Sequence, residues 1–335
     1  MRDIIKNSKI LVTGGTGSWG YGLVKKLLTY EPDQVIVYSR NESHQVKMHR
    51  ELAHPALTFK VGDIRDKEAL IEACDGIDYV FHLAALKHVD ICQNQPLEAL
   101  KTNVLGVQNL IEAAIRGNVK KVINVSSDKA ANPSNFYGLT KSIGEKLVLY
   151  ADSVSAHTRF ISVRSGNVIG TSESVVLLFK DQIRQNNRIG ITDKAMTRYF
   201  VTGDVTSELM LDALTDGLGG EIFLPDMPAC KITDLAEVIV EKYGNRDTEL
   251  KVVGIRPGEK LHEHLISDHE VKHTVLYEKD GKRYFVVLPS PDNKELSRHY
   301  AAHPRAQEKS YTSNSSGLMT KDEIEQMLRN GGFLN

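Results

Sequence analysis

The chain has 335 residues, of which 41% are hydrophobic and 25% are charged, and its formal net charge is −1. These values are ordinary for a globular protein with a substantial core. They exclude the strongly basic surface that attracts nucleic acid, and no apolar run approaches the roughly 20 residues of a membrane-spanning helix. Residues 1–6 contain no apolar segment of signal-peptide length.

The three cysteines, Cys74, Cys92 and Cys230, lie far apart and form no Cys-x-x-Cys pair. An odd number at such spacings fits buried thiols in a reducing compartment better than disulfides or a zinc site. We therefore expect a cytoplasmic protein.

Short β-branched segments alternate with longer amphipathic segments through the first half of the chain. Strands are predicted at residues 9–13 (KILVT), 34–38, 57–61, 79–83, 122–125 and 160–163, and helices at 22–30, 67–74 and 96–116. This alternation indicates βαβ units. The predicted fold class is therefore α/β, a Rossmann-type doubly wound parallel sheet with helices on both faces.

The pattern loosens after residue 166. Helices are predicted at 175–185, 204–216 and 233–243, and a strand at 221–224. We expect residues 1–166 to form the Rossmann domain, with 200–225 returning to it. Residues 167–335 would supply a smaller, partly interleaved ligand-binding lobe and a C-terminal tail.

The end of the chain predicts a flexible connection and a short helix. Residues 310–317 (SYTSNSSG) are polar throughout. Thr320-x-x-Glu323 is a capping-box pattern that begins a helix, and Gly331 is a typical residue to end it.

A glycine-rich turn follows the first predicted strand and opens the first predicted helix. Glycine lets the backbone turn sharply and approach a pyrophosphate, whose charge then faces the helix N-terminus. The position between strand and helix distinguishes this pattern from a glycine turn without a ligand. The candidate cofactor-binding residues in this turn are Gly14, Thr16, Gly17, Ser18, Trp19 and Gly20.

The end of the second predicted strand favours NADP over NAD. Folds that prefer NAD place an acidic residue here for the ribose 2′-hydroxyl, whereas this chain has Ser39 and Arg40. Arg40 would pair with a 2′-phosphate and Ser39 would add a hydrogen bond. The alternative is that Arg40 is simply a solvated surface residue.

The third and fourth predicted strands are followed by further candidate cofactor residues. Asp63 could accept a hydrogen bond from the adenine amino group, with Ile64 beside it. Ala84 and Ala85 are small and would leave room for the cofactor. Both stretches could instead be ordinary loops.

Tyr137 and Lys141 lie one helical turn apart, so their side chains point the same way. A tyrosine hydroxyl has an ordinary pKa of about 10, which a neighbouring ammonium lowers. The pair could take a proton from a substrate hydroxyl while the adjacent carbon gives hydride to a nicotinamide.

A polar cluster, Ser127-Asp128-Lys129, precedes this tyrosine by ten residues. It follows the fifth predicted strand, at the sheet edge where ligands of open parallel sheets collect. A plain dehydrogenase needs neither the carboxylate nor the second lysine. The alternative is a surface Asp-Lys dipeptide without a role.

Together these motifs resemble the extended short-chain dehydrogenase/reductase superfamily, and within it the inverting UDP-N-acetylglucosamine 4,6-dehydratases of pseudaminic-acid and related surface-sugar pathways. The resemblance spans residues 8–265, and its most specific parts are SDKAANP and RPGEK. Many relatives have threonine at the position of Ser127. Some replace the tyrosine by methionine, so Tyr137 favours the inverting type. The stretches that carry it are TGGTGSWG (13–20), AALKHV (84–89), KTNVLG (101–106), SDKAANP (127–133), RSGNVIG (164–170), ITDKAMTRYF (191–200) and RPGEKLHE (256–263).

The resemblance implies a dehydration of the sugar in three stages. C4 is oxidised, Lys129 then removes the C5 proton while Asp128 protonates the departing O6, and hydride returns to C6. No net redox change occurs, so tightly bound NADP is recycled. Burial would favour the neutral amine and the protonated acid, whereas an ion pair between the two groups would oppose both, and the sequence leaves this open.

The resemblance also implies substrate contacts. Ser127 would hydrogen-bond the C4 oxygen, and Lys87 and Asn103 would lie near the sugar and cofactor or behind Tyr137, although either could only stabilise a loop or helix. The candidates for the UDP half are Asn167, Arg198, Arg256 and Glu259, and each could instead brace the two lobes. Family members assemble as dimers and larger rings, so a homo-oligomer is expected, and the C-terminal tail could reach a neighbouring subunit.

Two other functions remain to be weighed against the dehydratase. A nucleotide-sugar epimerase needs the tyrosine and the cofactor but not Asp128 and Lys129. A non-catalytic nucleotide-sugar sensor would keep the fold without turnover. A metal site is not expected, because in the local cluster His262, Glu263, His264 and His269 residues two apart on a helix do not share a face.

Overall fold

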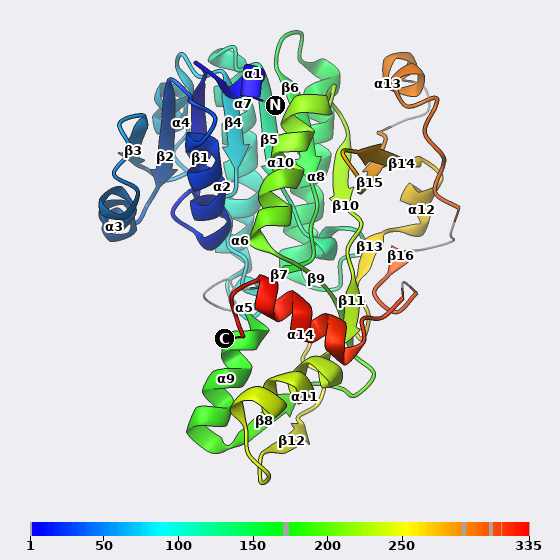
Figure 1. Cartoon of the computed structure of the whole chain (residues 1–335). Coiled ribbons are helices and arrows are strands. Elements are labelled where there is room, and N and C mark those ends of the chain that lie inside the picture. The colour runs from blue at the N-terminus through cyan, green and yellow to red at the C-terminus, as the bar shows by residue number, and fades with distance from the viewer. Residues whose placement is uncertain (1, 170–173, 290–292, 308–310, 316, 335) are drawn as a thin grey trace.

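The computed structural model describes residues 2–169, 174–289, 293–307, 311–315 and 317–334 (Figure 1). Within them, a nine-stranded sheet has the order β14-β15-β10-β6-β5-β4-β1-β2-β3. Its strands are β1 (Lys9–Thr13), β2 (Gln34–Ser39), β3 (Leu57–Val61), β4 (Tyr79–His82), β5 (Lys121–Val125), β6 (Arg159–Val163), β10 (Ile222–Pro225), β14 (Thr274–Lys279) and β15 (Lys282–Val287).

The sheet is parallel from β3 to β10, and all six strands predicted in the first half are present. The last two strands depart from the predicted parallel sheet. β15 pairs antiparallel with β10 and with β14. A two-residue turn joins this hairpin, and Asp280 and Gly281 both have positive φ, of 49° and 75°. An Asp-Gly pair is typical of such tight hairpins, so residues 274–287 carried a strand signal that we had not used.

Helices cover both faces of the sheet, as predicted for a doubly wound fold. One face packs on α2 (Ser18–Leu28), α3 (Glu42–Leu52) and α10 (Gly203–Asp216). The other packs on α4 (Lys67–Cys74), α7 (Gly106–Arg116) and α8 (Phe136–Val154). The remaining short helices of this part are α1 (Arg2–Ile5), α5 (Val89–Asn94), α6 (Pro96–Leu100), α12 (Asp268–Val271) and α13 (Lys294–His299).

The helix predicted at 96–116 is present but irregular. α6 continues into a π-helical segment, η1 (Lys101–Leu105), and then into α7. Such π-helical turns are often found at functional sites. The helix predicted at 22–30 begins earlier, at Ser18, because Gly17 is its N-cap.

A smaller lobe lies beyond the carboxyl ends of the parallel strands (Figure 1). Its core joins three helices and a parallel strand pair. These elements are α9 (Val175–Asn186), α11 (Ile232–Tyr243), α14 (Lys321–Asn330), β8 (Arg188–Ile191) and β12 (Glu249–Val252). Two small sheets lie between the lobe and the main sheet, β7 (Asn167–Val168) with β9 (Thr197–Val201) and β11 (Ala229–Lys231), and β13 (His264–Ile266) with β16 (Tyr311–Thr312).

The C-terminal segment is packed onto this lobe. α14 begins at the predicted capping box of Thr320 and ends at Gly331, and its Ile324 and Leu328 are buried in the lobe's core. The C-terminal helix is thus an integral part of the smaller lobe. In the described parts of the chain, no helix is both long and apolar enough to cross a bilayer.

The segment predicted to be a flexible connection is also docked where it is described; Ser310 and Ser316 lie outside the described residues. Its Tyr311 and Thr312 form β16, which pairs with β13. Ser313 is fully buried, and its hydroxyl hydrogen-bonds Thr197 Oγ1 at 2.6 Å. Polar composition was misleading here because the serine side chain finds its partners inside the protein.

Candidate active site

A cavity of about 330 Å³ lies along the carboxyl ends of β1 to β5. It reaches from the glycine-rich turn to the first turns of α8. Of the predicted cofactor-binding residues, those that line it are Gly14, Thr16, Gly17, Ser18, Trp19, Gly20, Ser39, Arg40, Asp63, Ile64, Ala84, Ala85, Lys87, Tyr137 and Lys141.

The glycine-rich turn has the shape that a dinucleotide requires. Gly14 has a φ of 69°, and a Cβ there would lie 2.7 Å from the backbone nitrogen of Ala84. Only glycine fits this position without displacing the neighbouring strand end. The turn leads into the N-terminus of α2, where backbone N–H groups favour a phosphate. The residues present therefore fit a nicotinamide dinucleotide.

At the end of β2, the rim of the cavity carries Arg40 in place of an acidic residue. The side chain of Arg40 is 57% exposed, and its NH1 lies 3.8 Å from Asp63 Oδ2. Asp63 is held mainly by Arg65, whose Nε and NH2 donate to Oδ2. Burial acts to raise the pKa of Asp63, but the hydrogen bonds from Arg65 outweigh it and lower that pKa.

Asn103 lies behind the cavity wall instead of lining it. Its Nδ2 donates to the carbonyl of Leu86 and to Thr140 Oγ1, and its Oδ1 accepts from the Leu86 N–H. Because protein partners occupy its amide, Asn103 braces the loop before α5 against α8. These contacts favour the alternative in which Asn103 stabilises a loop and a helix.

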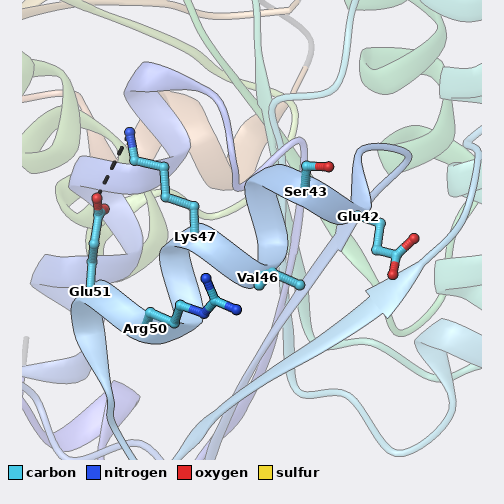
Figure 2. A pocket seen from close by; sticks show the side chains of 6 residues that line it. All are labelled: Glu42, Ser43, Val46, Lys47, Arg50 and Glu51. Carbon is cyan, nitrogen blue, oxygen red and sulfur yellow. Dashed lines mark ion pairs between the residues drawn. The ribbon is translucent and has the colours of Figure 1, made fainter.

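A second hollow, of about 590 Å³, lies on α3 at the edge of the sheet (Figure 2). Its six lining residues, Glu42, Ser43, Val46, Lys47, Arg50 and Glu51, all come from this one helix. Lys47 and Glu51 form an ion pair at 3.8 Å across one turn. We assign no function to it, because Tyr137 and Lys141 line the other cavity and no predicted catalytic residue lines this one.

Local capping places Tyr137. Asn135 caps α8 by accepting a hydrogen bond from the Gly138 N–H, so Tyr137 lies in the first turn. A Cβ on Gly138 would lie 2.5 Å from the carbonyl oxygen of Lys129. Glycine thus lets the first turn of α8 pack directly on the backbone of the Ser127-Asp128-Lys129 cluster.

The cluster itself is buried and internally hydrogen-bonded. Ser127 caps the short 3₁₀ helix η2 (Asp128–Ala130), and its hydroxyl donates to Asp128 Oδ1 at 3.0 Å. Lys129 Nζ donates to the same oxygen at 3.1 Å. The side chain of Asp128 is 1% exposed and that of Lys129 is 20% exposed. The alternative of a solvated Asp-Lys dipeptide is therefore wrong.

The ion pair decides the charge of Lys129. Burial acts to lower the pKa of this amine, but the carboxylates of Asp128 and Glu263 outweigh burial and raise it above its ordinary value. Of the two outcomes that the sequence left open, the ion pair prevails. Lys129 is thus an ammonium group in this state of the site.

Lys141 is buried and hydrogen-bonded to the end of β5. Its Nζ donates to the carbonyl oxygen of Val125 at 2.6 Å, and burial lowers its pKa to about 8. Burial raises the pKa of Tyr137, while the charge of Lys129 and a hydrogen bond with Ser127 act to lower it. The cation that favours the phenolate is therefore Lys129.

The residues predicted to bind the UDP half lie on β7, on β9 and in the segment between β12 and β13. Asn167 donates to the carbonyl of Tyr199, and Arg256 has a side chain that is 62% exposed. Glu259 lies 3.6 Å from Arg198 NH2. Arg198 is buried, and it donates to the backbone carbonyls of residues 197, 260 and 261. These contacts favour the bracing alternative for Arg198.

The RPGEK stretch meets the SDKAANP stretch across the site. The Gly258 carbonyl accepts hydrogen bonds from Ser134 Oγ and Asn135 Nδ2. Lys260 Nζ donates to the carbonyl of Asn132. The segment that precedes β13 is thereby tied to the loop that carries the catalytic cluster.

Glu263 is a charged residue beside the cluster that the sequence did not point to. We had weighed it only as part of a histidine-rich cluster, yet its buried carboxylate lies 3.7 Å from Lys129 Nζ and 3.7 Å from Arg198 Nε. Its neighbour His262 instead contacts Thr197 Oγ1 through Nδ1 at 2.8 Å. The only local signal was its place at the end of the RPGEKLHE stretch. The residues that line the cavity and were not predicted are Tyr38, Asn41, Gly62, Leu83, Thr102, Val125 and Ser126.

Comparison with known proteins agrees with this geometry. The family of polysaccharide biosynthesis proteins matches residues 10–284. UDP-N-acetylglucosamine 4,6-dehydratase (inverting) from Campylobacter jejuni serotype O:2 is 40% identical, over 86% of this chain and 84% of that enzyme. UDP-glucose 4-epimerase from Rickettsia felis is 35% identical, over 96% of this chain and 95% of that enzyme.

A solved structure extends the agreement to the whole fold. Pen from Bacillus thuringiensis has a TM-score of 0.90 and 35% identity, and the match covers 99% of each chain. The predicted resemblance to the inverting 4,6-dehydratases is confirmed by these matches. The chain belongs to the polysaccharide biosynthesis protein family.

Proposed function

We propose that this protein is a lyase that uses NADP to convert UDP-N-acetylglucosamine into a UDP-4-keto-6-deoxy-N-acetylhexosamine, with inversion at C5. The observation that carries the proposal is the buried Asp128–Lys129 ion pair at the carboxyl edge of the sheet, beside Tyr137. A dehydratase needs an acid and a base in addition to the tyrosine. The dehydratase relative supports the same reaction.

The cofactor would be held by the glycine-rich turn, the end of β2 and the wall formed by Ala84 and Ala85. When bound, it supplies a hydride acceptor for C4 and the hydride that returns to C6. The exposed guanidinium of Arg40 supports NADP, because it can reach a 2′-phosphate at the rim.

Tyr137 would take the proton of the C4 hydroxyl. Its phenolate form is favoured by the ammonium of Lys129 and by the hydroxyl of Ser127, against the effect of burial. With substrate bound, the Ser127 hydroxyl would turn from Asp128 Oδ1 to the C4 oxygen, because it has a single proton to donate. Lys141 anchors this end of the sheet through the Val125 carbonyl and lines the cavity close to the tyrosine.

Elimination requires a neutral Lys129 and a protonated Asp128. A single proton transfer from Nζ to Oδ1 over the 3.1 Å hydrogen bond creates both forms at once. Lys129 then removes the C5 proton, and Asp128 gives its proton to O6. The C6–O6 bond breaks and water leaves, so the pair ends with its original proton count. After hydride has returned to C6, C5 would take up one proton from water on the face opposite Lys129, which gives the inversion. Tyr137 would release to water the proton that it took from the C4 hydroxyl.

The UDP half would bind between the main sheet and the smaller lobe. We propose Asn167, Arg256 and Glu259 as its contacts, with Arg198 holding the loop that carries Glu259. The exposed Arg256 is the side chain best placed to meet a pyrophosphate through paired donors.

A nucleotide-sugar epimerase is the second candidate, and the Rickettsia felis relative favours it. An epimerase would leave the C6 hydroxyl intact. Incubating the purified protein with UDP-N-acetylglucosamine in deuterated water separates the two functions. Deuterium at C5 together with loss of O6 is the expected result, and NMR of the product reports the configuration at C5. An intact C6 hydroxyl in every product would rule out the dehydratase.

We also propose that the protein forms homo-oligomers in the cytoplasm. The outer face of α8 exposes Leu139, Ile143, Tyr150 and Val154, which lie on one side of the helix. Exposed apolar side chains gathered on one side of a helix are typical of an interface. The cytoplasmic location is supported by the three cysteines, which are free and buried.

A further inference from the structure

Glu263 is a buried carboxylate that the proposed mechanism does not use. Its side chain is 4% exposed and lies between two cations, with Oε1 at 3.7 Å from both Lys129 Nζ and Arg198 Nε. Its Oε2 is also buried, and among the described residues it has no hydrogen-bond partner. A buried carboxylate with an unsatisfied oxygen is costly, so a role beyond packing is expected.

The backbone of Glu263 is fixed from both sides. Its N–H donates to Ser313 Oγ at 2.9 Å, and its carbonyl accepts from the Ser313 N–H at 2.8 Å. Ser313 in turn contacts Thr197 on β9. The pairing of β13 with β16 continues this connection at His264. The carboxylate is therefore held facing the catalytic cluster by elements far away in the sequence.

We propose that Glu263 is a positioning residue that fixes the direction and the charge of the Lys129 amine, and so governs when this amine can remove the C5 proton. This inference rests on the proposed dehydratase function. In this proposal, the pairing of β13 with β16 holds the Glu263 carboxylate beside the Lys129 amine.

The physical argument concerns the proton shared by Lys129 and Asp128. Transfer of that proton from Nζ to Oδ1 breaks one N–H bond, forms one O–H bond and yields the reactive pair. A negative charge 3.7 Å from Nζ stabilises the ammonium and therefore opposes this transfer. Glu263 thus keeps the pair in its resting form.

The elements that pack around Lys129 bring other charged groups close to its amine. Asp128 acts in the same sense as Glu263, whereas Arg198 on β9 acts in the opposite sense. Tyr137 on α8 adds a smaller effect that favours the ammonium. Lys260, before β13, is a further cation that interacts with Lys129. Replacing the Glu263 carboxylate by an amide of the same shape removes one stabilising charge and leaves these groups in place.

The test is the reactivity of Lys129 toward acetic anhydride, followed by mass spectrometry across a pH series in the protein without substrate. Acetylation requires the neutral amine. In Glu263→Gln we expect the midpoint of the pH curve to fall by about one unit, which is roughly a tenfold faster acetylation at fixed pH. Glu263→Asp, which keeps the charge, should restore most of the wild-type curve and serves as the second variant if the amide does not fold.

Glu221→Gln is the matched control. Glu221 is also fully buried, but it accepts hydrogen bonds from the N–H groups of Leu218 and Gly219 before β10. Its replacement should leave the Lys129 curve unchanged. A Lys129 curve in folded Glu263→Gln that coincides with the wild-type curve would overturn the proposal.

A second measurement tests whether the charge of Glu263 affects turnover. Because the pair is active with one shared proton, the pH profile of C5 deuterium exchange should be bell-shaped. Both limbs should move to lower pH in Glu263→Gln. If wild-type protein never eliminates water, the dehydratase function fails, while the acetylation result still decides the role of Glu263. If wild-type protein turns over and neither profile moves in the variant, only the role of Glu263 fails.

Discussion

Replacing Arg164 by methionine is expected to destabilise the fold strongly, because this side chain binds two buried carboxylates at once. Its guanidinium is 1% exposed. It donates to Glu145 at 3.0 and 2.7 Å, and to Glu270 at 3.0 and 2.8 Å. A fifth hydrogen bond reaches the Leu265 carbonyl. One side chain thus joins β6 to α8 and α12.

The magnitude follows from what the substitution leaves behind. Methionine fills much of the volume but supplies no donor, so Glu145 and Glu270 would face each other without a cation. Removing one partner of a buried ion pair typically costs about 3–5 kcal/mol. The side chain of Glu145 is 2% exposed and that of Glu270 is 15% exposed, so solvent can screen little of this cost.

The assay is urea unfolding followed by circular dichroism, at one protomer concentration for all variants because self-association would otherwise change the apparent stability. Arg283→Met is the matched control. Arg283 pairs with Asp226 on the surface, where its side chain is 56% exposed, so its loss should cost well under about 1 kcal/mol. A loss of unfolding free energy for Arg164→Met no larger than that of this control would refute the reasoning.

The pH dependence of the stability difference between the wild type and Arg164→Met provides an independent check. Burial acts to raise the pKa of Glu270, but Arg164 outweighs it and lowers that pKa below its ordinary value of 4.5. A lowered pKa means that the wild-type pair stabilises the fold fully above about pH 4.5 and loses this contribution as pH falls through the folded-state value. Without Arg164 the buried carboxylates gain by taking up protons. The stability difference should therefore shrink as the pH falls from about 7 to about 5, and a constant difference would contradict the ion-pair explanation.

Four further substitutions test the proposed function. Lys129→Ala should bind cofactor and sugar, yet show no loss of O6 in the deuterated-water assay. Tyr137→Phe should stall earlier, at C4 oxidation, and so incorporate no deuterium at C5. Arg40→Ala should raise the dissociation constant for NADP by about tenfold or more and that for NAD little, because a charge-assisted hydrogen bond contributes about 1.5–3 kcal/mol. Tyr150→Arg, on the outer face of α8, should shift the protein toward a smaller assembly in sedimentation experiments.

Each substitution has a control variant or an outcome that would contradict it. Lys129→Arg keeps the charge but cannot act as a base at neutral pH, so it should also fail to eliminate water, and turnover in this variant would remove Lys129 from its role. Arg50→Ala lies on α3 away from the cavity and should leave both dissociation constants unchanged. Val46→Arg, also on α3, should leave the assembly unchanged. Normal C5 exchange in Tyr137→Phe would contradict the assignment of the tyrosine.

Much of the fold was predictable because its signals are local. Each buried parallel strand is a short β-branched run, and the turn after β1 needs glycine at Gly14 whatever the rest of the chain does. The N-terminal cap of α14 is likewise encoded by four consecutive residues, 320–323. The β14–β15 hairpin was missed although its Asp-Gly turn was visible, because strand pairing with β10 depends on residues about sixty positions earlier.

The sequence by itself determined the cofactor turn, the Tyr137–Lys141 spacing and the acid and base side by side at Asp128 and Lys129. Only the tertiary structure decided their charges, because ionisation depends on burial and on carboxylates brought close by folding. Glu263 lies 134 positions from Lys129 in the chain, yet it is within 3.7 Å in space. No local pattern encodes that approach, which arises from the pairing of β13 with β16 and from the close packing of α8 on the catalytic loop.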